Sequence, residues 1–105
     1  MRVRGNPRAQ VVRIGERLDA GTSAGVRSRL HEAVQAGEGD LIVDLSKLEM
    51  IDATGLGVLV GTHRLALSAQ RHLILRRVPP RIMRVLAVTR LNRVLRVEAT
   101  HAAVA

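Results

Sequence analysis

The side chains with the clearest chemical potential are Asp52 and Thr54, a carboxylate and a hydroxyl two residues apart at the predicted start of a helix. The first amides of a helix have no carbonyl partner within it, so either side chain can accept a hydrogen bond from them. The same amides, with the positive end of the helix dipole, also favour a bound phosphate group. The pair therefore indicates either an ordinary helix cap or a hydroxyl presented for recognition.

Two elements must position this pair. Residues 41–45 form an apolar run with a β-branched centre, which is typical of a strand that is covered on both faces. Beyond Thr54 the large apolar residues recur at Leu56, Leu59, Val60 and Leu67, which is close to the spacing of one helical face. The sequence therefore predicts a buried strand, a loop that contains Asp52, and an amphipathic helix.

The remaining chain predicts alternating strands and helices. Further strands are expected at residues 10–14, 72–75 and 94–97. Thr22 or Ser23 can cap a helix that runs to about residue 35 and stops at Gly37. Pro80 suits the first turn of a last helix, whose inward face is expected to consist of Ile82, Val85, Leu86 and Thr89. Such alternation favours an α/β fold with a largely parallel sheet.

The loop and its flanks carry a family resemblance. Residues 41–46 read Leu-Ile-Val-Asp-Leu-Ser and residues 50–59 read Met-Ile-Asp-Ala-Thr-Gly-Leu-Gly-Val-Leu. This pattern resembles the STAS domain family of bacterial anti-sigma factor antagonists, in which the second Ser of an Asp-Ser-Ser-Gly loop is phosphorylated by a partner kinase. Thr54 occupies the place of that Ser. The resemblance implies a single STAS domain over residues 1–105, with a mostly parallel sheet of four to five strands, helices packed on it, and a final helix that is short or absent.

Weaker matches and some departures surround the loop. Residues 12–22 and 72–97 resemble the family's first strand-to-helix entry and its later elements. Ala53 replaces the first Ser of the pair, so Thr54 is left as the lone acceptor. Arg71 stands where the family usually has Gly. The N-terminal strand is expected either at residues 1–4 or not at all.

By resemblance, the unphosphorylated protein binds an anti-sigma factor with a GHKL-type serine/threonine kinase fold and frees a sigma factor, and phosphorylation of Thr54 releases it. Gly55 is expected to permit close approach by the partner's backbone. Ser46 is a weaker candidate for the contact face. The full set of expected partner-binding residues is Asp19, Thr22, Ser46, Asp52, Ala53, Thr54, Gly55 and Leu56.

Charge leaves other functions open. The net charge of +8 arises beyond residue 52, where nine arginines face one acidic residue, Glu98. Arg77, Arg81 and Arg84 recur at helical spacing and can form one basic stripe. One alternative is therefore a basic module that binds a polyanion, although the absence of Phe, Tyr and Trp argues against single-stranded nucleic acid.

The other alternative is a STAS scaffold subunit that binds a transporter ATPase without being phosphorylated.

Catalysis and cofactor binding have little support in the sequence. There is no Cys, and the four His are scattered without metal-ligand spacing. The glycines at 55, 57 and 61 imitate a dinucleotide motif, but the strand ends too early for one. We interpret Gly57 and Gly61 instead as allowing the helix to pack closely against a neighbour. The sequence predicts a non-enzymatic protein with no cofactor or metal.

At 105 residues the chain suits one domain. Its apolar runs are shorter than a membrane span, and no signal peptide pattern opens it, so a soluble cytoplasmic protein without membrane contact is expected. Its oligomeric state is left open by the sequence, a dimer included.

Overall fold

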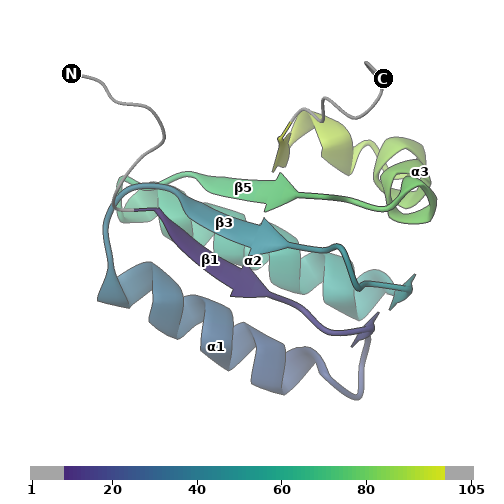
Figure 1. The fold of residues 1–105 in the computed structure, drawn as a ribbon, viewed down its shortest axis with the longest axis horizontal. Coiled ribbons are helices and arrows are strands. Elements are labelled where there is room, and N and C mark those ends of the chain that lie inside the picture. The colour runs from purple at the N-terminus through teal and green to yellow at the C-terminus, as the bar shows by residue number, and fades with distance from the viewer. Residues whose placement is uncertain (1–8, 99–105) are drawn as a thin grey trace.

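A parallel four-stranded sheet forms the centre of the fold in the computed structural model, which describes residues 9–98 (Figure 1). The strands lie in the order β1-β3-β5-β6. Their bounds are Gln10–Arg13 for β1, Leu41–Asp44 for β3, Leu73–Arg76 for β5 and Arg96–Val97 for β6. The mostly parallel α/β architecture expected from the sequence is confirmed. The proposed first strand and final helix lie outside the described residues.

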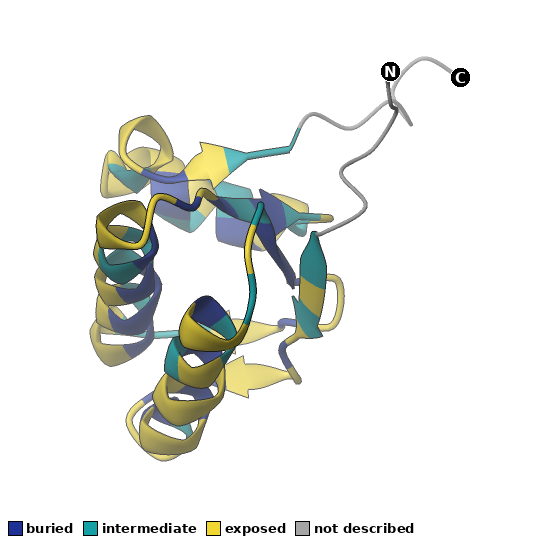
Figure 2. Ribbon diagram, turned by 90° about the vertical axis from the view of Figure 1, so that its left-hand side faces the viewer, coloured by how far each residue is buried: buried dark blue, intermediate teal, exposed yellow. Residues whose placement is uncertain are grey.

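Helices α1 (Ser23–Ala36) and α2 (Ala53–Ser68) connect the first three of these strands, and they pack against each other and against the sheet. Figure 2 shows that the buried sides of the helices face the strands. The chain has no aromatic residue, and mainly aliphatic side chains fill this interface. Among those with no exposed surface are Leu30, Leu41, Val43, Leu59 and Leu75.

The inward face of α2 differs from the predicted one. Leu59 is fully buried as expected, but Leu67 is 47% exposed. The helix turns its small residues inward instead, and the fully buried positions Thr62 and Ala66 continue the face. The Thr62 hydroxyl donates to the Val58 carbonyl, 2.8 Å away, so its burial leaves no polar group unpaired.

The close-packing role expected of Gly57 and Gly61 is wrong. Both glycines are exposed, and a Cβ added at either would have no neighbour from another element within 4 Å among residues 9–98. The glycine that does permit close packing in α2 is Gly55, which lies in the first turn.

The C-terminal part also departs from expectation. Helix α3 (Pro80–Val88) begins at Pro80 as predicted, but Thr89 lies beyond its end and is exposed. The Thr89 hydroxyl donates to the Val85 carbonyl rather than packing inward. The strand predicted at residues 94–97 is limited to β6, because a short 3-10 helix, η1 (Leu91–Arg93), and a turn precede it.

The described residues form no helix that is both long and apolar enough to cross a membrane.

Arg71, the departure from the family pattern, is a buried structural side chain. It is only 3% exposed, and its guanidinium donates to the carbonyls of Ala33 and Val34 at the end of α1, at 2.7 and 2.8 Å. It also donates to the Gly39 carbonyl at 2.8 Å and to Gln10 Oε1 at 2.6 Å. The Ala33 and Val34 carbonyls would otherwise be left without partners at the end of α1. The side chain of Arg71 therefore ties α1 to the start of the sheet.

Replacing Arg71 with Ala is expected to lower the free energy of unfolding by about 2–4 kcal/mol, because several buried carbonyls lose their donor together. Urea denaturation followed by circular dichroism measures the change. Arg64→Ala removes an exposed arginine and serves as the control, with an expected effect within about 0.5 kcal/mol. Equal effects of the two substitutions would contradict the structural role of Arg71.

Candidate functional site

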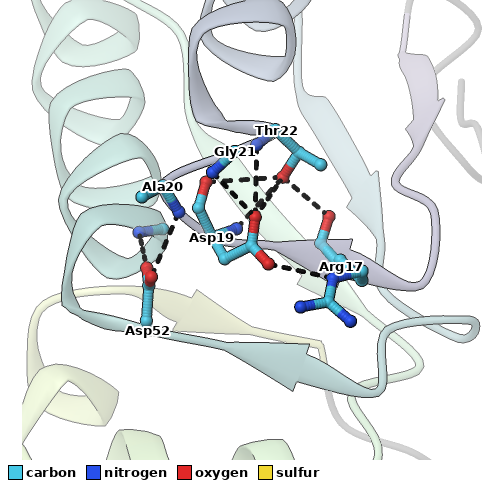
Figure 3. Close-up of polar contacts among 7 residues, drawn as sticks. Arg17, Asp19, Ala20, Gly21, Thr22 and Asp52 are labelled. Carbon is cyan, nitrogen blue, oxygen red and sulfur yellow. Dashed lines mark hydrogen bonds and ion pairs between the residues drawn. The ribbon is translucent and has the colours of Figure 1, made fainter.

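Two loops at the carboxyl end of the sheet are joined by a second, very small sheet. Strands β2 (Arg17–Leu18) and β4 (Met50–Ile51) pair in parallel, and each leads directly into a loop that begins a helix. The Asp52 amide donates to the Leu18 carbonyl at 3.3 Å, and the Ala20 amide donates to Asp52 Oδ2 at 3.1 Å. The starts of α1 and α2 therefore lie side by side (Figure 3).

Asp52 is the cap of α2. Its Oδ1 accepts from the Gly55 amide at 2.9 Å, while its Oδ2 holds Ala20 in the neighbouring loop. Thr54 is the second residue of the helix, and its side chain is exposed. The sequence allowed either residue to be the cap, and the structure assigns that role to Asp52. The capping role of Asp52 leaves the Thr54 hydroxyl without a structural task in this turn.

Gly55 is buried, and its missing side chain is required by the fold itself. A Cβ at this position would overlap the carbonyl oxygen of Leu18 and lie 2.9 Å from the carbonyl carbon. The expectation that Gly55 makes room for a partner's backbone is therefore corrected. The close neighbour is strand β2 of the same chain, which Gly55 allows to approach the first turn of α2.

The loop before α1 is ordered around Asp19. Asp19 Oδ2 accepts from Arg17 Nε at 2.9 Å, and Oδ1 accepts from the Gly21 and Thr22 amides at 3.0 and 3.2 Å. The hydrogen bond from Arg17 is the main cause that lowers the pKa of Asp19; the Thr22 and Gly21 amides add to this lowering, and burial opposes it. Asp19 is therefore a carboxylate at neutral pH.

Thr22 occupies the cap position of α1 but does not cap the helix with its side chain. Its hydroxyl accepts from the Asp19 amide at 3.0 Å and donates to the Arg17 carbonyl at 3.1 Å. Thr22 therefore stands at the predicted cap position, but its hydroxyl bonds backward within the loop and does not cap the helix, and Ser23 is a buried helix residue. Asp19 and Thr22 thus act mainly as internal supports of the loop.

The exposed part of this edge has a polar and an apolar component. Ala53 and Thr54 are exposed, and Leu56 is half-buried. Met50, which no sequence pattern selected, is 44% exposed in β4. We refer to these four residues at the start of α2 and just before it, Met50, Ala53, Thr54 and Leu56, as the Thr54 face.

Ser46 is exposed just beyond the end of β3. Its amide donates to Asp44 Oδ1 at 2.8 Å. Burial raises the pKa of Asp44, but the hydrogen bonds from Ser46 and the charges of Arg13 and Arg77 outweigh it and leave the pKa below its usual value. Arg77 lies before α3 and pairs with Asp44, so it does not extend the predicted basic stripe. The other two residues of that stripe, Arg81 and Arg84, line a cleft with Ser46.

Within residues 9–98 no cluster of three His, Cys, Asp or Glu side chains is arranged to hold a metal ion.

The sequence did not reveal Arg17, the Ala20 amide or the Leu18 carbonyl, which complete the contact between the two loops. A pair of two-residue strands is too short to show a periodic pattern in the sequence, and backbone amides and carbonyls are common to every residue. Only the structure therefore reveals these contacts.

Comparison with known proteins agrees with this geometry. The STAS domain family model matches residues 1–104. An anti-sigma F factor antagonist of Paenibacillus polymyxa is 36% identical over 56 residues, which are 52% of this chain and 48% of that protein. The chain therefore matches about half the length of this curated relative.

Two solved proteins share the fold. An anti-sigma-factor antagonist domain protein of Planctomyces limnophilus is 22% identical, with a TM-score of 0.75 over 89% of this chain and 85% of its own. SpoIIAA is 21% identical in its unphosphorylated and phosphorylated forms, with TM-scores of 0.71 and 0.65. Both forms align with 94% of this chain, which corresponds to 87% and 90% of theirs. The parallel sheet, the joined loops and the match over nearly the whole sequence place this chain in the STAS domain family.

Gly55→Ala is expected to lower the free energy of unfolding by about 1–3 kcal/mol or more, because the new methyl group overlaps the rigid backbone of β2. Gly57→Ala, two residues further along the same helix, meets open space and is expected to raise stability by up to about 1 kcal/mol. Chemical denaturation of both variants checks the opposite signs. A stabilising Gly55→Ala substitution would show that the contact with Leu18 is not tight.

Proposed function

We propose that this protein is a non-enzymatic anti-sigma factor antagonist that acts in the cytoplasm and is controlled by phosphorylation of Thr54. The unmodified protein binds an anti-sigma factor with a GHKL-type kinase fold and so frees a sigma factor. The observation that carries the proposal is the exposed Thr54 hydroxyl in the first turn of α2, beside a cap that is already supplied by Asp52. The name of the curated relative and the family membership support the same role.

The first turn of α2 suits a phosphate group. The kinase transfers the γ-phosphoryl group of ATP to the Thr54 hydroxyl, which loses its proton, and ADP leaves. The modified side chain gains a charge of about −1.5 to −2 at neutral pH. The amides of Ala53 and Thr54 lie in the turn where a helix offers no carbonyl partner, and the helix dipole is positive there. The phosphorylated protein therefore keeps its fold.

Release follows from the same charge. The phosphate lies two residues from the carboxylate of Asp52, whose two oxygens are already used within the chain. A partner surface that fits a neutral hydroxyl would have to bury both negative charges together, and burial of unpaired charge is costly. A cost of about 3 kcal/mol weakens binding more than about a hundredfold.

Partner contacts are proposed for the predicted set, with roles that follow from exposure. Ala53, Thr54 and Leu56 on the Thr54 face meet the partner directly, and Ser46 extends the contact toward β3. Asp19, Thr22, Asp52 and Gly55 contribute mainly by holding the two loops together.

The test is a pull-down from a lysate of the source cell with wild type, Thr54→Ala and Thr54→Glu, with the captured anti-sigma factor quantified by mass spectrometry. Wild type and Thr54→Ala are expected to capture it, and Thr54→Glu at least about tenfold less. Incubation with ATP is expected to phosphorylate wild type at Thr54 and to release the partner. Thr54→Ala is expected to stay bound.

Thr89→Glu is the matched control, because it makes the same substitution at an exposed threonine at the end of α3. It is expected to bind like wild type. Equal capture by Thr54→Glu and wild type would contradict release by charge. Phosphate found on Thr54→Ala, at Ser46 for example, would place the switch elsewhere. A transporter ATPase in the captured fraction in place of an anti-sigma factor would favour a scaffold role.

A further inference from the structure

A second hollow lies beside the C-terminal half of α2, away from the Thr54 face. It has a volume of about 310 Å³ and is bounded by α2, the start of β5 and the segment from η1 to β6. His63 contributes to it from α2, nine residues beyond Thr54. At the helical rise, this places His63 about 14 Å along the axis from the switch. We call this hollow the His63 pocket.

The polar lining of the His63 pocket is basic. Arg93, Arg96, His63 and His72 line it, and none of the lining residues within 9–98 is a carboxylate. The Nδ1 atom of His63 is buried and has no hydrogen-bond partner among residues 9–98. Buried polar atoms are usually paired, so this nitrogen is an exception in the described part of the chain.

The pocket also has apolar walls. Leu67 and Val94 are 47% and 48% exposed, and both border it. Leu73 and Leu95, each only 2% exposed, complete the apolar lining. The pocket therefore combines exposed apolar side chains with two arginines. A site that binds polyanions by charge alone would need no apolar contact.

We propose that the His63 pocket docks an acidic segment of a partner protein in which leucine-like side chains are interspersed with carboxylates. The carboxylates pair with the guanidinium groups of Arg93 and Arg96. The apolar side chains cover Leu67 and Val94. Because the pocket and the Thr54 face lie at different parts of α2, both can be occupied at once, and the protein can hold a second partner during the cycle of binding and release.

The test uses the full chain and a fluorescently labelled peptide of sequence Glu-Leu-Glu-Asp-Leu-Leu-Glu, with blocked ends, as the probe. Amide chemical shifts in two-dimensional NMR locate the binding, and fluorescence anisotropy measures its affinity. Shift changes are expected at residues 63, 67 and 93–96. Arg93→Glu combined with Arg96→Glu is expected to weaken binding about tenfold or more, and Leu67→Ser by several-fold.

Controls separate docking from attraction by net charge. Arg27→Glu combined with Arg29→Glu makes the same change in charge at exposed positions of α1 outside the pocket, and it is expected to bind the peptide within about twofold of wild type. Thr54→Glu is expected to bind like wild type, which keeps this result separate from the proposed switch.

Three results would overturn the proposal. The first is an absence of shift changes at the pocket, and the second is equal loss of affinity in the two double variants. The third is equal binding of a peptide with glycine in place of leucine, which would indicate a site for any polyanion, nucleic acid included.

Discussion

The carboxylate of Asp52 is the contact on which the candidate site depends. One oxygen caps α2 through the Gly55 amide, and the other holds the Ala20 amide of the loop before α1. A single side chain therefore satisfies two backbone donors and fixes the first turn of α2 relative to the loop that leads into α1. Because the cap is supplied by Asp52, the exposed hydroxyl of Thr54 is not needed to cap the helix.

This arrangement relies on supports at both ends of the fold. At the candidate site, the absence of a side chain at Gly55 lets β2 lie directly against α2. At the other end of the sheet, Arg71 binds backbone carbonyls at the end of α1 and the side chain of Gln10 in β1. In a core without aromatic side chains, such specific polar contacts fix the relative positions of elements that packing alone would leave less well defined.

Much of the fold could be predicted because buried segments show apolar runs or apolar periodicity in the sequence. The apolar run at residues 41–45 and the Pro80 helix start were both correctly located. Predictions failed where short-range pattern does not determine the outcome. Leu67 was assigned inward by spacing, but the small residues Gly55 and Ala66 set the face that packs. Gly57 and Gly61 matched a close-packing spacing, but no element of the described residues lies within 4 Å of a Cβ added at either position.

The sequence indicated Asp52 and Thr54 at the candidate site but not their separate roles. The sequence located Asp52 and Thr54 at a helix start, yet both can cap, and the choice depends on where Leu18 and Ala20 lie in space. Arg17 and Met50 belong to strands of two residues, which are too short for periodicity to indicate. Hydrogen bonds to the backbone of a distant loop, such as that of Ala20 to Asp52, are set by tertiary structure alone.

If Asp52 holds the start of α2 and the hydroxyl of Thr54 does not, the free energies of unfolding of Asp52→Ala and Thr54→Ala must differ. Urea denaturation measures both. We expect a loss of about 1–3 kcal/mol for Asp52→Ala, from the cap and the bond to Ala20, and a change within about 0.5 kcal/mol for Thr54→Ala. A loss for Thr54→Ala as large as that for Asp52→Ala would show that the hydroxyl of Thr54 is structural and would contradict the separate roles of the two side chains.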